Sequence, residues 1–117
     1  MAYVDGVVIP VLKSNKAAYI DAAGKMAAVF KEFGALNVVD CWGDDVPDGK
    51  LTSFPLAVKL EAEETVVFSW LTWPSRAARD EAWKKVMADP RMAPGVAPMP
   101  FDGKRMIFGG FEVVSDV

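Results

Sequence analysis

The chain has 117 residues, of which 52% are hydrophobic and 25% charged, a composition typical of one folded domain spanning residues 1–117. Thirteen basic and sixteen acidic residues give a net charge of −3, which argues against binding of nucleic acid or an anionic membrane surface. One cysteine excludes an intrachain disulfide, and the lack of histidine removes the commonest metal ligand and general base.

Neither a membrane-spanning helix nor an export signal is expected. No stretch reaches the roughly 18 consecutive apolar residues that a membrane span needs. Near the N-terminus, Asp5 and Gly6 interrupt the apolar run that a signal peptide requires. Together with the low cysteine content, these features predict a protein of the reducing cytoplasm.

The first elements are predicted to be a strand and a long helix. Tyr3–Val11 is rich in β-branched residues and is expected to form the strand. Ser14 or Asn15 can cap the helix, and apolar residues then recur every three or four positions as far as Phe33. Gly34 follows where the residue after a helix adopts a positive φ.

The middle of the chain contains one clear strand and one ambiguous segment. Leu36–Trp42 is predicted to be a strand, and Val46–Lys50 (VPDGK) has the composition of a turn. The β-branched residues of Thr52–Leu60 permit another strand. A cap at Ser53 or the residue before it, with Pro55 in the first turn, favours the short helix that we predict.

The remainder is predicted to form a strand, a helix and a last strand. Thr65–Trp73 (TVVFSWLTW) is the clearest strand, and Ser75 can cap a helix that Asp89–Pro90 ends. Arg91–Pro100 is interrupted by prolines and is expected to be irregular, whereas Arg105–Val114 is expected to be a strand. The buried side of the second helix is predicted to carry Ala78, Ala82, Trp83, Val86 and Met87.

The element order β-α-β-β-α-β predicts a ferredoxin-like α+β fold, with a four-stranded antiparallel sheet and two helices on one face. In Thr65–Trp73, however, both alternating faces carry large apolar side chains, and a face open to water normally alternates apolar with polar residues. We therefore expect a homodimer in which two sheets pack face to face and form an α+β barrel. In the alternative, a monomer, Thr52–Leu60 and the proline-rich segment would cover the second face.

Three carboxylates lie within otherwise apolar predicted strands: Asp5, Asp40 and Glu112. A buried carboxylate is costly unless it is paired or neutral. If Asp5 and Glu112 face a cavity, burial would favour their neutral forms and make both candidate catalytic bases. The alternatives are ion pairs with Arg79, Arg105 or a lysine, or exposed positions at a strand edge.

Aromatic side chains are abundant, with four tryptophans and seven phenylalanines. They can line a pocket for a flat apolar or aromatic ligand, with a tyrosine or an indole N–H as its polar group. The alternative is that they are ordinary core and interface residues. The candidate substrate-binding residues are Tyr3, Trp42, Phe68, Trp70 and Phe108.

Other chemistry has little support. Cys41 has acidic neighbours and no cation to stabilise a thiolate, so we expect a small buried structural residue. The acidic residues Asp40, Asp44, Asp45 and Asp48 do not have the spacing of a calcium loop, and we expect neither a metal site nor a cofactor.

Several segments of the sequence resemble the YbaA-like family of bacterial proteins of unknown function, and the resemblance implies a dimeric α+β barrel. That fold group includes cofactor-independent monooxygenases, which suggests a small-molecule enzyme with its pocket between sheet and helices. Asp5 or Glu112 would then be the base, and Trp42 and Trp70 would be walls. The rival hypothesis is a non-catalytic ligand-binding or structural homodimer. The segments are VDG (4–6), KEFGAL (31–36), CWGDDVPDGK (41–50), VFSWLTWPS (67–75), DPRM (89–92) and MPFDGKRMIFGGFE (99–112).

Overall fold

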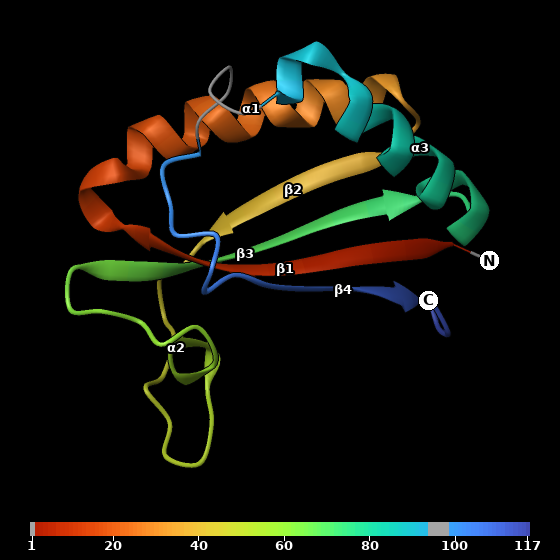
Figure 1. The fold of residues 1–117 in the computed structure, drawn as a ribbon. Helices are drawn as coiled ribbons and strands as arrows, with labels where there is room; N and C mark the ends of the chain where they lie inside the picture. Colours follow the sequence, from red (N-terminus) through yellow and green to blue (C-terminus); the bar gives the residue numbers. More distant parts are fainter. Residues whose placement is uncertain (1, 94–98) are drawn as a thin grey trace.

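The fold is a four-stranded antiparallel sheet with two long helices on one face, as the sequence predicts (Figure 1). It is seen in a computed structural model that describes residues 2–93 and 99–117. The strands lie in the order β2-β3-β1-β4, so the first and third strands occupy the centre. The elements are β1 (Tyr3–Leu12), α1 (Lys16–Glu32), β2 (Asn37–Trp42), α2 (Phe54–Ala57), β3 (Glu64–Trp73), α3 (Arg76–Ala88) and β4 (Ile107–Glu112).

Capping residues set the ends of the shorter helices. The Ser53 Oγ accepts a 3.0 Å hydrogen bond from the Leu56 N–H at the start of α2, which confirms the predicted short helix. The Ser75 Oγ accepts a 3.1 Å bond from the Ala78 N–H at the start of α3. At α1, by contrast, Asn15 is the cap residue but its side chain makes no capping bond.

The core between sheet and helices is closed at the end where α3 packs on β3. Trp73 and Val86 are fully buried there, and Phe30 of α1 is 2% exposed. The rings of Phe30 and Trp83 meet edge to face at 4.9 Å. This packing fixes the distance of α1 and α3 from the sheet, and it therefore decides how much space remains elsewhere in the layer.

The helices cover the two faces of the sheet unequally. α1 and α3 lie over one face, which we call the inner face, and α2 lies beyond the opposite or outer face (Figure 1). The α2 region covers part of the outer face, because Val58 is buried against Val8 and Val66. Elsewhere Phe68 is 44% exposed and Phe111 is 60% exposed. Most of the outer face is therefore apolar and uncovered.

Several local expectations were wrong. Met87 is 70% exposed rather than buried, because it lies at the last turn of α3, beyond the packed core. Cys41 is also exposed, because it pairs with Phe68 on the outer face of the edge strand β2. The last strand begins at Ile107, later than expected, since Arg105 is engaged in ion pairs with Glu64 and Asp102.

The proline-rich segment is described only in part. Pro90–Met92 forms a 3₁₀ turn in which the Arg91 N–H donates to the Asp89 side chain, which confirms that α3 ends there. Residues 94–98, which belong to the segment expected to be irregular, lie outside the described residues.

Candidate functional site

A cavity of about 550 Å³ lies between the inner face of the sheet and the helices. Its walls are almost wholly apolar, and a ligand pocket of this size is typical of proteins that bind small molecules. All five methionines of the described residues line it, although they come from three separate parts of the sequence. These residues are Met26, Met87, Met92, Met99 and Met106.

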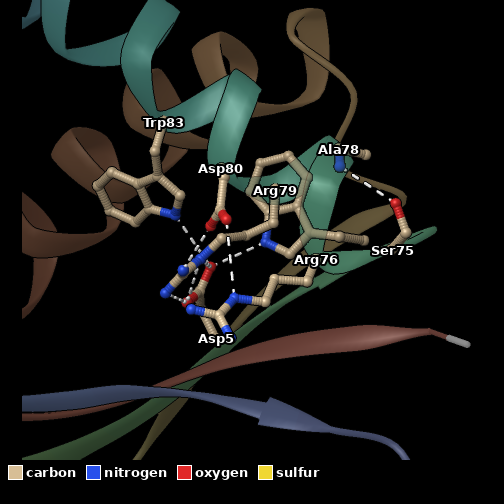
Figure 2. A network of polar contacts seen from close by, with 8 residues as sticks. Asp5, Ser75, Arg76, Ala78, Arg79, Asp80 and Trp83 are labelled. Carbon is tan, nitrogen blue, oxygen red and sulfur yellow. Dashed lines mark hydrogen bonds and ion pairs between the residues drawn. The ribbon is translucent and has the colours of Figure 1, made fainter.

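One end of the cavity carries a buried carboxylate, Asp5, on which three side chains converge (Figure 2). Its Oδ1 accepts from the Arg79 Nη2 at 2.7 Å and from the Arg79 Nε at 3.0 Å. Its Oδ2 accepts from the indole N–H groups of Trp73 and Trp83, each at 2.9 Å, and at 3.2 Å from the same Arg79 Nε. A carboxylate has about four acceptor positions, so those of Asp5 are fully occupied.

The sequence places these donors by simple geometry. Asp5 and Trp73 point to the inner face from neighbouring strands, as the β1–β3 register requires. Arg79 and Trp83 are four residues apart on α3, so both project from the same side of that helix. Arg79 also donates to Asp80 at 2.9 Å. The hydrogen bonds from Arg79 to Asp5 are the main cause that raises the pKa of the Arg79 guanidinium above its ordinary value.

The strand β4 lies beneath this cluster, and its Gly110 leaves space for the side chains above it. The Arg79 guanidinium lies 5.3 Å from the centre of the Tyr3 ring, in a cation–π arrangement. Both groups lie over Gly110 of β4. A Cβ at Gly110 would overlap the Tyr3 hydroxyl and would lie 2.9 Å from the Arg79 Nη2. A side chain at this position would have to displace the Tyr3 ring or the Arg79 guanidinium.

Toward β2, the cavity contains a second polar pair of different character. The Tyr19 hydroxyl of α1 donates a 2.7 Å hydrogen bond to the Asp40 Oδ1 of β2. Tyr19 is 3% exposed, and its burial, followed by its bond to Asp40, raises the pKa of the phenol far above the ordinary value. Tyr19 therefore remains a neutral donor. Among the described residues, its hydroxyl is the one hydrogen-bond donor placed on Asp40.

Among the described residues that line the cavity, no cation pairs with the negative charge of Asp40. Arg79 is the one cation among the lining residues that the structure describes, and it is already bound to Asp5 and Asp80. Ser69 lies beside Asp40 in the β2–β3 register and also lines the cavity. This part of the cavity therefore presents hydrogen-bond acceptors next to apolar walls.

A third polar cluster supports the wall from outside. Arg105 forms two parallel 2.7 Å bonds with the buried Glu64 and a 2.9 Å bond with Asp102. The hydrogen bonds from Arg105 lower the pKa of Glu64 below its ordinary value. Arg105 lies between Phe101 and Met106, which both line the cavity. The cluster therefore anchors the segment that closes this side.

The predicted site residues are distributed over different parts of the structure. Asp5 and Phe108 line the cavity. Tyr3 lies under Arg79, outside the lining, and Trp42 lies behind Tyr19 with a ring separation of 6.2 Å.

Three other predicted residues are not brought to the cavity. Glu112 is exposed at the end of the edge strand β4. Phe68 and Trp70 point to the outer face, because they alternate with the cavity-lining Ser69 and Leu71. We therefore do not retain Trp70 as a cavity wall or Glu112 as a base within it.

Sequence reasoning did not assign the Tyr19–Asp40 pair or the methionine lining. One signal was present for Asp40. It is a carboxylate in an apolar strand, and its side chain lies on the same face of that strand as those of Val38 and Trp42. No comparable signal exists for the methionines, because the segments that carry them are joined only by the fold.

Comparisons with known proteins agree with the fold. Residues 2–103 match the family described as protein of unknown function, DUF1428. The chain is 57% identical over 116 residues to the uncharacterized protein YbaA of Escherichia coli K12, and equally to that of Shigella flexneri, with 99% of each chain covered. A mutant of SnoaB, a cofactor-independent oxygenase from Streptomyces nogalater, has a similar structure at a TM-score of 0.58 and 13% identity, covering 98% of this chain and 96% of that one.

The described residues contain no group of three or more acidic or cysteine side chains placed to share a metal ion. Nor do they include a helix whose length and hydropathy would suit it to crossing a bilayer.

Proposed function

The chain belongs to the DUF1428 family of unknown function, and we propose that it is a homodimeric protein that binds a small, mainly apolar molecule in the cavity between sheet and helices. The observation that carries this proposal is the cavity itself, about 550 Å³ in volume, with apolar walls and a few polar groups. Close packing normally leaves few voids larger than a water molecule, so a space of this size indicates an occupant.

The methionine lining indicates the kind of ligand. Methionine side chains are flexible and polarisable, and they adapt their shape to apolar molecules of different outline. Aromatic rings complete the walls, because Phe101 lies 6.2 Å from Tyr19 and Phe108 also lines the cavity. This combination favours a flat apolar or aromatic ligand.

Ligand binding is tested by blocking the cavity. Binding of naphthalene derivatives is measured by quenching of tryptophan fluorescence, to which Trp83 in the cavity wall contributes. Ala27→Trp fills the cavity from α1, whereas Ala28→Trp adds the same side chain at an exposed neighbouring position. We expect Ala27→Trp to abolish binding and Ala28→Trp to preserve it. Equal binding to both variants would refute the cavity as the binding site.

The uncovered outer face supports the homodimer. Phe68, Ile107 and Phe111 are each more than two-fifths exposed there, and they form one apolar surface across β3 and β4 with β1 between them. The segment between β2 and β3, which contains α2, extends beyond this face (Figure 1). Leu51 in this segment is 98% exposed. A second copy packed against this face would cover the exposed strands.

The oligomeric state is tested with two matched variants. Phe68→Glu places a charge on the outer face, and Ile20→Glu places one at an equally apolar exposed position on α1. Analytical ultracentrifugation should show that the unmodified protein and Ile20→Glu are dimers. Phe68→Glu should shift to monomer. A monomeric unmodified protein at micromolar concentration would contradict the proposal.

A second candidate is a cofactor-independent enzyme acting on the same ligand. The fold shared with SnoaB and the uncompensated carboxylate of Asp40 in the cavity favour it. Asp5, the base expected from the sequence, has all its acceptor positions occupied, so Asp40 is the better candidate proton acceptor. The test is oxygen uptake in the presence of polycyclic phenols without added cofactor, comparing the unmodified protein with Asp40→Asn.

A further inference from the structure

We propose that Asp40, oriented by Tyr19, is the head-group site of the cavity, and that it takes a neutral hydroxylated aromatic molecule whose hydroxyl donates to the carboxylate. This inference rests on the proposed ligand-binding function and deepens it, because it assigns the chemical class of the ligand. The hydrogen-bonding positions that are still free on the polar groups of the cavity decide which ligand group can bind.

The carboxylate of Asp5 has no acceptor position left for a ligand. Its Oδ1 accepts two hydrogen bonds from Arg79, and its Oδ2 accepts from the indoles of Trp73 and Trp83 and shares the Arg79 Nε–H. An indole has a single N–H, which Asp5 uses in both tryptophans. A ligand donor at this end would have to displace bonds that are already made.

The Asp40 end has free acceptor positions, and its tyrosine donor is already used. Asp40 accepts one bond, from Tyr19, among about four that a carboxylate can accept. The Tyr19 hydroxyl has one hydrogen, and Asp40 uses it. Asp40 is exposed and is one of the lining residues, so a ligand can reach it. The ligand group that matches the free positions of Asp40 is therefore a donor.

Charge selects among donors. An anionic head group would meet the negative charge of Asp40, and the charge of Arg79 is already balanced by Asp5 and Asp80. An ammonium group would exchange most of its hydration for one charged acceptor, Asp40, among mainly apolar walls. A hydroxyl has one donor, which the carboxylate satisfies with a charge-assisted bond.

The ring environment fits an aromatic body attached to that hydroxyl. The Tyr19 ring stands between Trp42 and Phe101, with both ring centres at 6.2 Å and tilted. Phe101 and Tyr19 both line the cavity. A flat ligand can therefore contact aromatic side chains while its hydroxyl lies at Asp40.

Matched probes that share one ring system test the inference. They are 2-naphthol, its methyl ether 2-methoxynaphthalene, the anion 2-naphthoate, and the cation of 2-(aminomethyl)naphthalene. Dissociation constants are measured by tryptophan fluorescence for the full-length protein. We expect 2-naphthol to bind about tenfold more tightly than the ether, as one charge-assisted hydrogen bond allows, and more tightly than both charged probes.

The protein variants remove the acceptor without leaving an unpaired group. In the double variant Asp40→Leu with Tyr19→Phe, both partners are replaced by apolar groups of similar size. We expect the double variant to bind 2-naphthol and the ether equally, with the ether's affinity unchanged. The variant Ala28→Trp, which leaves the cavity open, should keep the tenfold preference.

The outcomes separate this inference from the proposed function. Equal binding of 2-naphthol and the ether by the unmodified protein would overturn the head-group site while leaving ligand binding intact. Tighter binding of the cation or the anion would overturn it as well, by assigning a different head group. Binding of no probe, or binding that Ala27→Trp does not affect, would overturn both the inference and the proposed function.

Discussion

The two polar ends of the cavity differ in how completely their hydrogen-bonding capacity is used. Asp5 accepts five bonds from two tryptophans and an arginine, with the Arg79 Nε–H shared between its two oxygens, whereas Asp40 accepts one from Tyr19. Both are aspartates on the inner face of the same sheet, and both line the same cavity.

This difference separates a structural role from a binding role. A carboxylate whose acceptor positions are full links the elements that donate to it, and Asp5 links β1 to β3 and α3. A carboxylate with unused positions at a cavity is available to a ligand. Residue type and burial alone would favour Asp5 over Asp40 as the functional group. The number of acceptor positions already occupied on each carboxylate favours Asp40 instead.

Replacing Asp5 should have the largest effect on stability. Asp5→Ala leaves the Arg79 guanidinium and two indole N–H groups without their acceptor inside the fold. We expect the free energy of unfolding to fall by about 3–5 kcal/mol, as for other broken buried ion pairs. Urea denaturation measures this change. A loss below about 1 kcal/mol would contradict the structural role of Asp5.

Glu64, a buried carboxylate that accepts three hydrogen bonds, tests whether such a group is structural at a second place. Glu64→Gln removes the charge from its paired bonds with Arg105, and we expect a loss of about 1.5–3 kcal/mol at neutral pH. The folded-state pKa of Glu64 lies below the ordinary 4.5, so its contribution is present above pH 4.5 and disappears as the pH falls through the folded-state value. Urea titrations between pH 7 and pH 3 should therefore show the two proteins converging in stability.

Gly110 tests whether the Asp5 cluster depends on the space beneath it. Gly110→Ala would push Tyr3 and Arg79 away, and we expect a loss of about 1–3 kcal/mol from overpacking. Gly24→Ala is the control, because no atom lies within 4 Å of a Cβ at Gly24 in α1. The control should gain about 0.5–1 kcal/mol from the better helix former. Equal shifts in thermal melting for the two variants would refute the close approach at Gly110.

Much of the fold was accessible from the sequence because local signals agree with it. Ser75 before α3, Ser53 before Pro55, and Gly34 after α1 each mark a boundary that the structure confirms. The antiparallel four-stranded sheet follows from the order of the elements. These features depend on interactions between residues close together in the chain.

The site was less accessible because it depends on which face of each strand receives the helices. β3 is apolar on both faces, so its sequence does not show that Ser69 faces the cavity while Phe68 and Trp70 face outward. The partners of Asp5 lie 68 to 78 residues away along the chain. Pairing with Arg79 was one alternative, but nothing local distinguishes it from a pair with a lysine.

The substitution of Tyr19 should have the smallest effect on stability, and it tests the Asp40 end of the cavity alone. Tyr19→Phe removes the one bond to Asp40, and because Asp40 is exposed, water can replace the lost donor. We expect a loss of about 0.5–1.5 kcal/mol in urea denaturation, well below that of Asp5→Ala. Asp40 would still carry its charge, so the preference for 2-naphthol over its ether should be reduced by the loss of orientation but not abolished. A loss of stability as large as that of Asp5→Ala would mean that both ends of the cavity are structural, and the difference between them would no longer indicate where a ligand binds.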